Sequence, residues 1–138
     1  MRAEAIFGPV SILALWTAMV LLQTGLRRLG AVRSRRVRGS AFRYGESADV
    51  PDDLKVWNRN LMNLLEMPIL FYVVCISFYV TRHVTAGVVT LAWVYVALRL
   101  LHSVVHLTTN RVIVRFSLFA AGNVVLVAQW IAFIKRVL

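Results

Sequence analysis

Four long apolar runs separated by polar segments restrict what this chain can fold into. The chain has 138 residues, of which 59% are hydrophobic, and a soluble domain of this size cannot bury so much apolar surface. The first run, residues 6–26, carries no charge and is long enough to cross a hydrocarbon core of about 30 Å at 1.5 Å per residue. The sequence therefore predicts an all-α integral membrane protein with a single four-helix transmembrane domain, residues 1–138.

Local signals place the ends of the predicted helices. Pro51 followed by Asp52 and Asp53 is typical of a helix start, because proline suits the first turn and acids favour the positive end of the helix dipole. Pro68 lacks an N–H and is expected to kink the second helix near Leu64. The predicted helices span about residues 6–26, 52–80, 85–107 and 112–134, with a basic loop over residues 27–51.

Positive charge is concentrated in one part of the chain. The 16 Lys and Arg outnumber the 6 Asp and Glu, and nine of the 16 lie between Arg27 and Arg59. Such a surplus is found in nucleic-acid-binding proteins, but its clustering after an apolar run is more simply that of a cytoplasmic loop. We expect no nucleic-acid partner, residues 27–59 and 108–111 inside, and both termini outside; Lys135 and Arg136 are a small exception to this rule.

Polar side chains inside the predicted helices fall on matching faces. They are Arg27, Arg59, Asn63, Glu66, Arg99, His102, His106 and Arg115. Within one helix, spacings of three and four place such residues on the same face. Charges at these depths are costly and normally face a bundle interior or a wet cavity. Because the helices alternate in direction, all eight converge on the cytoplasmic half, which predicts one polar pocket open to the cytosol.

The predicted pocket has more positive than negative charge. Four arginines face a single carboxylate, Glu66, and guanidinium groups match carboxylates well, so an anionic ligand is expected. Glu66 either pairs with an arginine or receives the ammonium group of a ligand. Two structural alternatives stay open: Arg59 and Arg115 can extend to lipid phosphates, and Glu66 with Arg99 can form an ion pair that holds helices together.

Metal binding and disulfide formation are not expected. His102 and His106, four residues apart, could in principle hold a metal or haem. No third histidine lies nearby, and the neighbouring arginines would repel a cation. The lone Cys75 excludes an intrachain disulfide and a cysteine-built zinc site.

Two motifs resemble those of a known family. The first is Arg59-xxx-Asn63-xx-Glu66, followed by a proline and an aromatic-rich apolar run. The second is Arg99-xx-His102-xxx-His106, with Arg115 nine residues later. In this order, within four helices and after a long basic first loop, they resemble the membrane-associated proteins in eicosanoid and glutathione metabolism (MAPEG). The resemblance covers nearly the whole chain.

The resemblance implies a four-helix bundle assembled as a homotrimer, with glutathione held at subunit interfaces on the cytoplasmic side. By motif match, Arg59, Asn63 and Glu66 would hold the polar groups of glutathione. His102 and His106 would line the site, and Arg115 would lie next to the thiol and favour the thiolate. Arg27 resembles the arginine of the first family helix, although Arg28 is as good a candidate.

The chain departs from the family pattern at three positions. His106 stands where eicosanoid members carry Tyr, Phe116 where one branch has Ser, and Pro68 follows Glu66 more closely than usual. The sequence around Pro68 is similar to that of small bacterial members, which implies a bacterial inner membrane.

The expected function is therefore that of a glutathione- or related thiol-dependent enzyme acting on lipophilic electrophiles or lipid hydroperoxides. A non-catalytic scaffold or anionic-lipid-binding protein is the alternative. A small proton-coupled exporter is disfavoured, because four arginines surround the one carboxylate that would switch.

Overall fold

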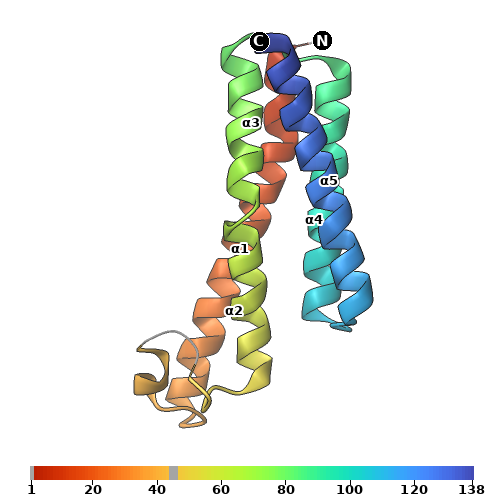
Figure 1. Ribbon diagram of the computed structural model, residues 1–138. Helices are drawn as coiled ribbons and strands as arrows, with labels where there is room; N and C mark the ends of the chain where they lie inside the picture. The colour runs from red at the N-terminus through yellow and green to blue at the C-terminus, as the bar shows by residue number, and fades with distance from the viewer. Residues whose placement is uncertain (1, 44–46) are drawn as a thin grey trace.

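All regular structure in the described part of the chain, residues 2–43 and 47–138 of a computed structural model, is helical (Figure 1). Its elements are the 3-10 turns η1 (Ala3–Ile6) and η2 (Gly39–Phe42) and the helices α1 (Phe7–Arg33), α2 (Asp52–Leu65), α3 (Pro68–Val80), α4 (Ala86–Leu107) and α5 (Val112–Val137). Four stretches, Ala3–Arg33, Asp52–Val80, Ala86–Leu107 and Val112–Val137, are long and apolar enough to cross a membrane. The predicted all-α class is confirmed, and these four stretches are consistent with the predicted four-helix membrane bundle.

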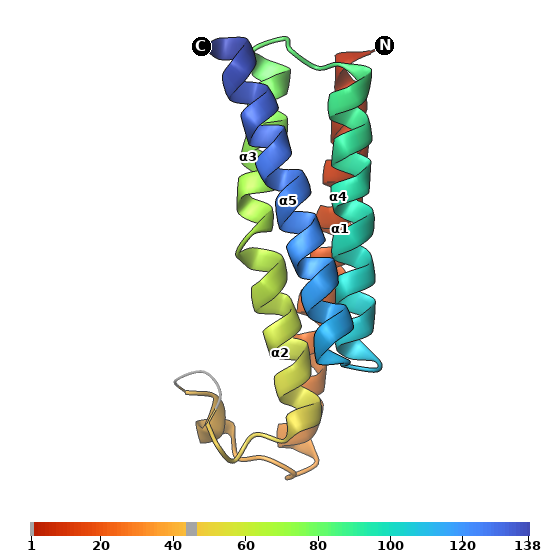
Figure 2. The ribbon, with the colours of Figure 1, turned by 45° about the vertical axis from the view of Figure 1, so that its right-hand side comes forward.

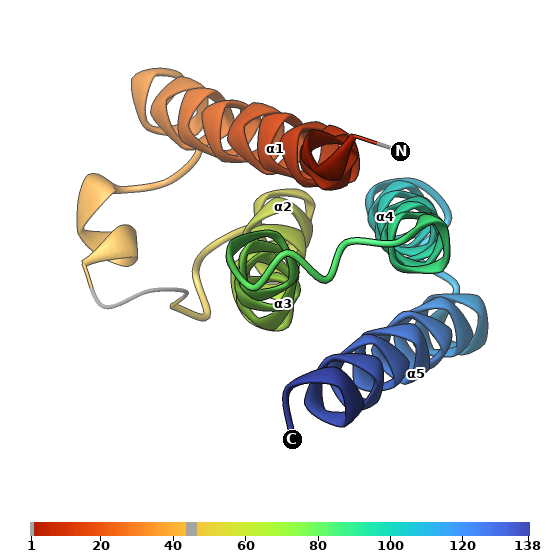
Figure 3. The same cartoon turned by 90° about the horizontal axis from the view of Figure 1, so that it is seen from above.

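The four spans lie side by side, with both chain termini at one end of the bundle (Figure 1). The segment between α1 and α2 and the short turn between α4 and α5 lie at the opposite end (Figure 2). Seen along the bundle, α1 and α5 lie on opposite sides of the other helices (Figure 3). Helix α1 packs on α2 and α4, whereas α5 packs on α4 and, near the termini, on α3. The basic segment and the α4–α5 turn are thus at the same end, as predicted.

Helix α1 continues to Arg33, past its predicted end at Leu26. Arginine is a good helix former, and positive side chains are favourable near the negative end of the helix dipole, so the first arginines prolong the helix. Near the end of α1, a small apolar cluster packs the loop against α1 and α2; its members are Ala31, Val37, Val50 and Leu54. The basic segment that was expected to be a loop from residue 27 is therefore partly helical.

The second span is broken between α2 and α3. Glu66 ends α2 with φ −83° and ψ −88°, and α3 starts at Pro68. Proline has no N–H to donate to the carbonyl of Leu64, and its ring would clash with that carbonyl in a continuous helix. The predicted interruption by Pro68 is confirmed, and its position is Glu66–Met67, just after the expected Leu64.

Apolar side chains fill the interior and also cover the outside of the bundle. Inside, the rings of Phe71 and Tyr95 stack with centroids 4.5 Å apart, and both residues are fully buried. Outside, Leu15 is 67% exposed and Ile113 is 81% exposed. An apolar exterior of this kind suits contact with lipid. A surface exposed to water would carry mainly polar groups at these positions.

A buried polar contact joins three helices near the middle of the bundle. The hydroxyl oxygen of Ser103 on α4 accepts hydrogen bonds from Trp16 Nε1 on α1, at 2.9 Å, and from Asn60 Nδ2 on α2, at 2.7 Å. Asn60 and Ser103 are fully buried. Because unpaired polar groups are costly away from water, this contact fixes α2 against α4 in one register.

Which end of the bundle faces the cytosol is a testable prediction from the distribution of positive charge. A reporter fused within the loop at Ser40 should give a cytoplasmic signal, and one fused after Leu138 an external signal. A fusion in the exposed turn at Arg82 serves as a second external control. Equal signals at Ser40 and Leu138 would contradict the four-span topology, and exchanged signals would contradict the orientation.

Candidate functional site

A cavity of about 600 Å³ lies between α2, α4 and α5, at the end of the bundle that carries the basic segment. Its described lining residues are Asn58, Arg59, Met62, Asn63, Glu66, His102, His106, Val112, Arg115, Phe116 and Phe119. The residues of both sequence motifs therefore meet at one cavity, with the exception of Arg99; Arg27, the predicted site residue of the first helix, does not line it either. Of the eight polar residues that were predicted to converge from four helices, six line the cavity, and they come from three helices.

Helix α2 presents Arg59, Asn63 and Glu66 to the cavity along one face, as their spacing predicts. Asn63 Nδ2 donates to the backbone carbonyl of Arg59 at 2.9 Å, which leaves its side-chain oxygen as an acceptor. Arg59 and Glu66 are exposed. Glu66 lies at the helix break, so its carboxylate stands where α2 ends. This wall offers one cation, one anion and one amide to a ligand.

Arg99 lies outside the lining of the cavity, although it was predicted to bind the ligand. It is fully buried, its Nη2 donates to the backbone carbonyl of Asn63, and its guanidinium lies 5.3 Å from the ring centroid of Phe119. In a continuous helix the carbonyl of Asn63 would accept a hydrogen bond from the N–H of Met67, but Met67 lies in the break between α2 and α3. Arg99 therefore caps the C-terminus of α2, where a positive charge also suits the helix dipole.

The ion pair considered between Glu66 and Arg99 is not formed in the described structure. Ion pairs that the structure does contain include Arg36 with Asp53 at 3.2 Å and Lys55 with Asp52 at 3.4 Å, both near the start of α2. The carboxylate of Glu66 instead faces the cavity.

His102 and His106 form the α4 wall of the cavity. Their ring centroids are 5.8 Å apart, and both side chains are almost completely buried. His102 Nδ1 lies 3.0 Å from the backbone carbonyl oxygen of Arg115, which links α4 to α5. A carbonyl oxygen only accepts hydrogen bonds, so Nδ1 of His102 is the donor.

Arg115 is held at the edge of the cavity by the turn before α5. Its Nη1 donates to Asn110 Oδ1 at 2.7 Å, and its side chain is half-buried. Asn110 adopts the left-handed conformation, φ 47°, which asparagine tolerates better than most residues. The backbone N–H of Asn110 donates to the carbonyl of Val105 at 2.7 Å, so the turn is fixed to α4. Arg115 thus has an ordered partner and lines the cavity, in contrast to the alternative in which it extends to lipid.

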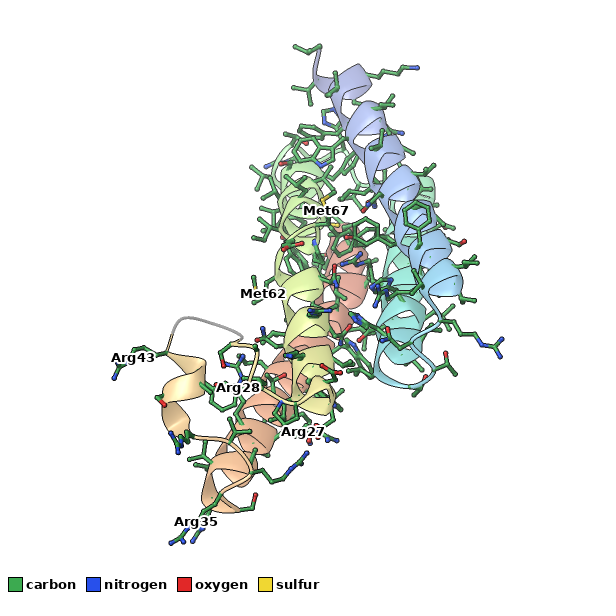
Figure 4. All side chains as sticks on the ribbon, turned by 60° about the horizontal axis from the view of Figure 1, so that its bottom comes forward. Arg27, Arg28, Arg35, Arg43, Met62 and Met67 are labelled. Atoms are coloured by element: carbon green, nitrogen blue, oxygen red, sulfur yellow. The ribbon has the colours of Figure 1, made fainter. Side chains whose placement is uncertain are left out.

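Arg27 and Arg28 lie on α1 beside α2, outside the lining of the cavity (Figure 4). The guanidinium of Arg27 lies 4.2 Å from the ring centroid of Trp57. Arg28 Nη2 donates to Asn58 Oδ1 at 2.5 Å, and Asn58 lines the cavity. Arg28 therefore contacts a residue that lines the cavity.

The apolar wall of the cavity was not predicted from the sequence. Met62 on α2 and Val112, Phe116 and Phe119 on α5 complete the lining. Met62 is 48% exposed and Phe116 is 68% exposed, so the cavity has an apolar edge next to the lipid-facing surface. The three α5 residues share a face with Arg115, but apolar residues in a membrane helix are expected on every face.

The cap on α2 leads to a testable prediction. Replacing Arg99 with Met removes the donor to the carbonyl of Asn63, and a hydrogen bond to a charged group contributes about 1.5–3 kcal/mol. Amide hydrogen exchange across residues 62–67 should therefore rise by about tenfold or more. The exposed Arg82, replaced in the same way, should leave it unchanged. Unaltered exchange in Arg99→Met would show that other contacts hold the break.

Comparison with known proteins identifies the family of the chain. No significant match was found among curated proteins or among solved structures. The sequence model of the MAPEG family matches residues 6–135, which is nearly the whole chain. The chain therefore belongs to the MAPEG family.

Proposed function

We propose that this protein is a glutathione- or related thiol-dependent membrane enzyme that acts on lipophilic electrophiles or lipid hydroperoxides. The family consists of glutathione-dependent transferases, peroxidases and related proteins. The observation that supports the proposal most directly is that Arg59, Asn63, Glu66 and Arg115 all line one cavity, which also has an apolar wall. A polar thiol and an apolar co-substrate can therefore meet there.

The charges of the cavity suit glutathione, which carries two carboxylates, one ammonium group and a thiol. In the proposed complex, Arg59 pairs with a carboxylate, Asn63 binds the peptide groups, and Glu66 receives the ammonium. Arg115 lies across the cavity on α5 and is available for the sulfur. Arg99 stabilises this arrangement by donating a hydrogen bond to the carbonyl of Asn63 at the end of α2.

The proposed role of Arg115 is to stabilise the thiolate. An arginine side chain keeps its positive charge under all physiological conditions, and its effect is strong where water is scarce. Lowering the pKa of a thiol by two units requires about 2.7 kcal/mol, which nearby guanidinium groups can supply. The bilayer would deliver the apolar co-substrate to the wall formed by Met62, Val112, Phe116 and Phe119.

We further propose that the protein is a homotrimer in a bacterial inner membrane, with the cavity facing the cytosol. Family resemblance and the positive charge of the α1–α2 segment support this arrangement. The exposed apolar faces of the helices provide surface both for neighbouring subunits and for lipid.

Glutathione binding to the purified protein in nanodiscs, measured by calorimetry, tests the proposal directly. Wild type should bind, and Glu66→Gln should bind more weakly while unfolding at a similar temperature, because only the partner of the ammonium is lost. Glu4→Gln, exposed and at the opposite end of the bundle, is the control. Absence of binding would overturn the thiol-dependent function. Binding without turnover of any electrophile or hydroperoxide would favour the non-catalytic alternative.

Substitution of Arg115 tests the thiolate. Arg115→Ala should leave glutathione affinity within about tenfold, or ~1.4 kcal/mol, because most contacts survive, but should abolish the ultraviolet absorbance of bound thiolate. Arg115→Lys should retain part of that absorbance, since the charge stays and the fork is lost. Arg111→Ala, exposed and outside the cavity, is the control. An unchanged thiol pKa in Arg115→Ala would remove Arg115 from the mechanism.

A further inference from the structure

The ring of His102 is held in one orientation by a single backbone contact. Nδ1 lies 3.0 Å from the carbonyl oxygen of Arg115, which can only accept, so Nδ1 carries the proton of the neutral ring. The other nitrogen, Nε2, is then a bare acceptor. The backbone of α5 thereby sets which nitrogen of His102 is able to take up a proton.

Nε2 of His102 has no hydrogen-bond partner among the described residues, and it is closed off from solvent. The side chain is 3% exposed, yet it forms part of the cavity wall. A buried acceptor without a partner is unfavourable, and most such groups in proteins are paired. A donor brought into the cavity by a ligand would satisfy it, and a thiol is such a donor.

The surroundings of His102 arrange a base, its orienting group and a cation together. Arg115 orients the ring through its backbone carbonyl, while its guanidinium lines the same cavity. The ring centroids of His102 and Phe119 are 5.8 Å apart, and the guanidinium of Arg99 lies against the other ring, that of Phe119. The remaining titratable or charged groups that line the cavity are His106 on α4 and Arg59 and Glu66 on α2. A base oriented by a third group, next to the nucleophile, is the usual way of activating a weak nucleophile.

We propose that His102 is the base that removes the proton of the bound thiol, through Nε2, while Arg115 stabilises the thiolate that results. This inference rests on the proposed thiol-dependent function and adds to it the destination of the proton. It assigns His102 a direct chemical role, in addition to lining the site.

The step balances for conjugation to an α,β-unsaturated carbonyl compound. The S–H bond breaks, its electron pair stays on sulfur, and the proton forms an N–H bond at Nε2. The thiolate then forms a C–S bond at the β-carbon, and the displaced electron pair gives an enolate. The imidazolium returns its proton to the enolate, so the histidine is regenerated without an oxidant or reductant.

Two variants separate proton transfer from structural support. His102→Asn places an amide N–H where Nδ1 lies, so it keeps the contact with the carbonyl of Arg115 but has no base. His102→Ala leaves a space that a free imidazole can enter. With glutathione and trans-2-nonenal as the probes, both variants should lose about 100-fold or more in kcat, because general base catalysis contributes about 10²–10⁴-fold. Glutathione affinity should change by less than tenfold.

Added imidazoles of graded basicity should rescue His102→Ala, with a rate that rises with their basicity. His83→Ala, which changes a histidine outside the cavity lining at the far end of the bundle, should retain wild-type kcat. Wild-type kcat in His102→Asn, or the absence of a basicity-dependent rescue in folded, glutathione-binding His102→Ala, would overturn the role of His102 alone. A wild type that binds glutathione but does not conjugate nonenal would overturn this inference together with the proposed conjugation.

Discussion

The contact between Arg99 and the backbone carbonyl of Asn63 is the interaction on which the rest of the site depends. Pro68 interrupts the second span, and the interruption leaves carbonyl groups at the end of α2 without their usual helical partners. Arg99 supplies a donor from α4, and its guanidinium also lies against Phe119 of α5. The buried side chain of Arg99 thus joins α4 to both α2 and α5, the three helices that form the walls of the cavity. Burying a charge is costly, and here the helix terminus and an aromatic ring compensate for part of that cost.

Much of the fold and part of the site could be predicted from the sequence because the signals were local. Four long apolar runs can satisfy their backbone groups in lipid only as helices, so the spans followed from length and composition. The break could be predicted from Pro68, because its missing N–H removes the hydrogen bond to a carbonyl only one turn earlier in the same helix. The shared face of Arg59, Asn63 and Glu66 followed from helical spacing, and these residues do line the cavity.

The rest could not be predicted, because it depends on contacts between helices. An arginine in a membrane helix indicates a polar environment, but sequence spacing does not distinguish a ligand-binding arginine from one that caps another helix, as Arg99 does. The apolar wall formed by Val112, Phe116 and Phe119 has the same composition as a lipid-facing surface. Nor does any local signal join Trp16 and Asn60 to Ser103, since the three come from different helices. The predicted end of α1 at Leu26 is wrong because a cluster of positive charge ends the apolar run but not the helix, and arginine is a good helix former.

The length of α1 has a consequence for how the protein sits in its bilayer. At 1.5 Å per residue its 27 residues extend about 40 Å, beyond a hydrocarbon layer of about 30 Å. The guanidinium of Arg27 lies 4.2 Å from the ring centroid of Trp57, and an arginine with a tryptophan is a pair of the kind that anchors helices at a membrane surface. A thicker bilayer would draw this pair inward, and hydrophobic mismatch would then be relieved by a change of helix tilt. Because α2 forms one wall of the cavity, such a change of tilt would alter the width of the cavity opening, and bilayer thickness would in this way affect access to the site.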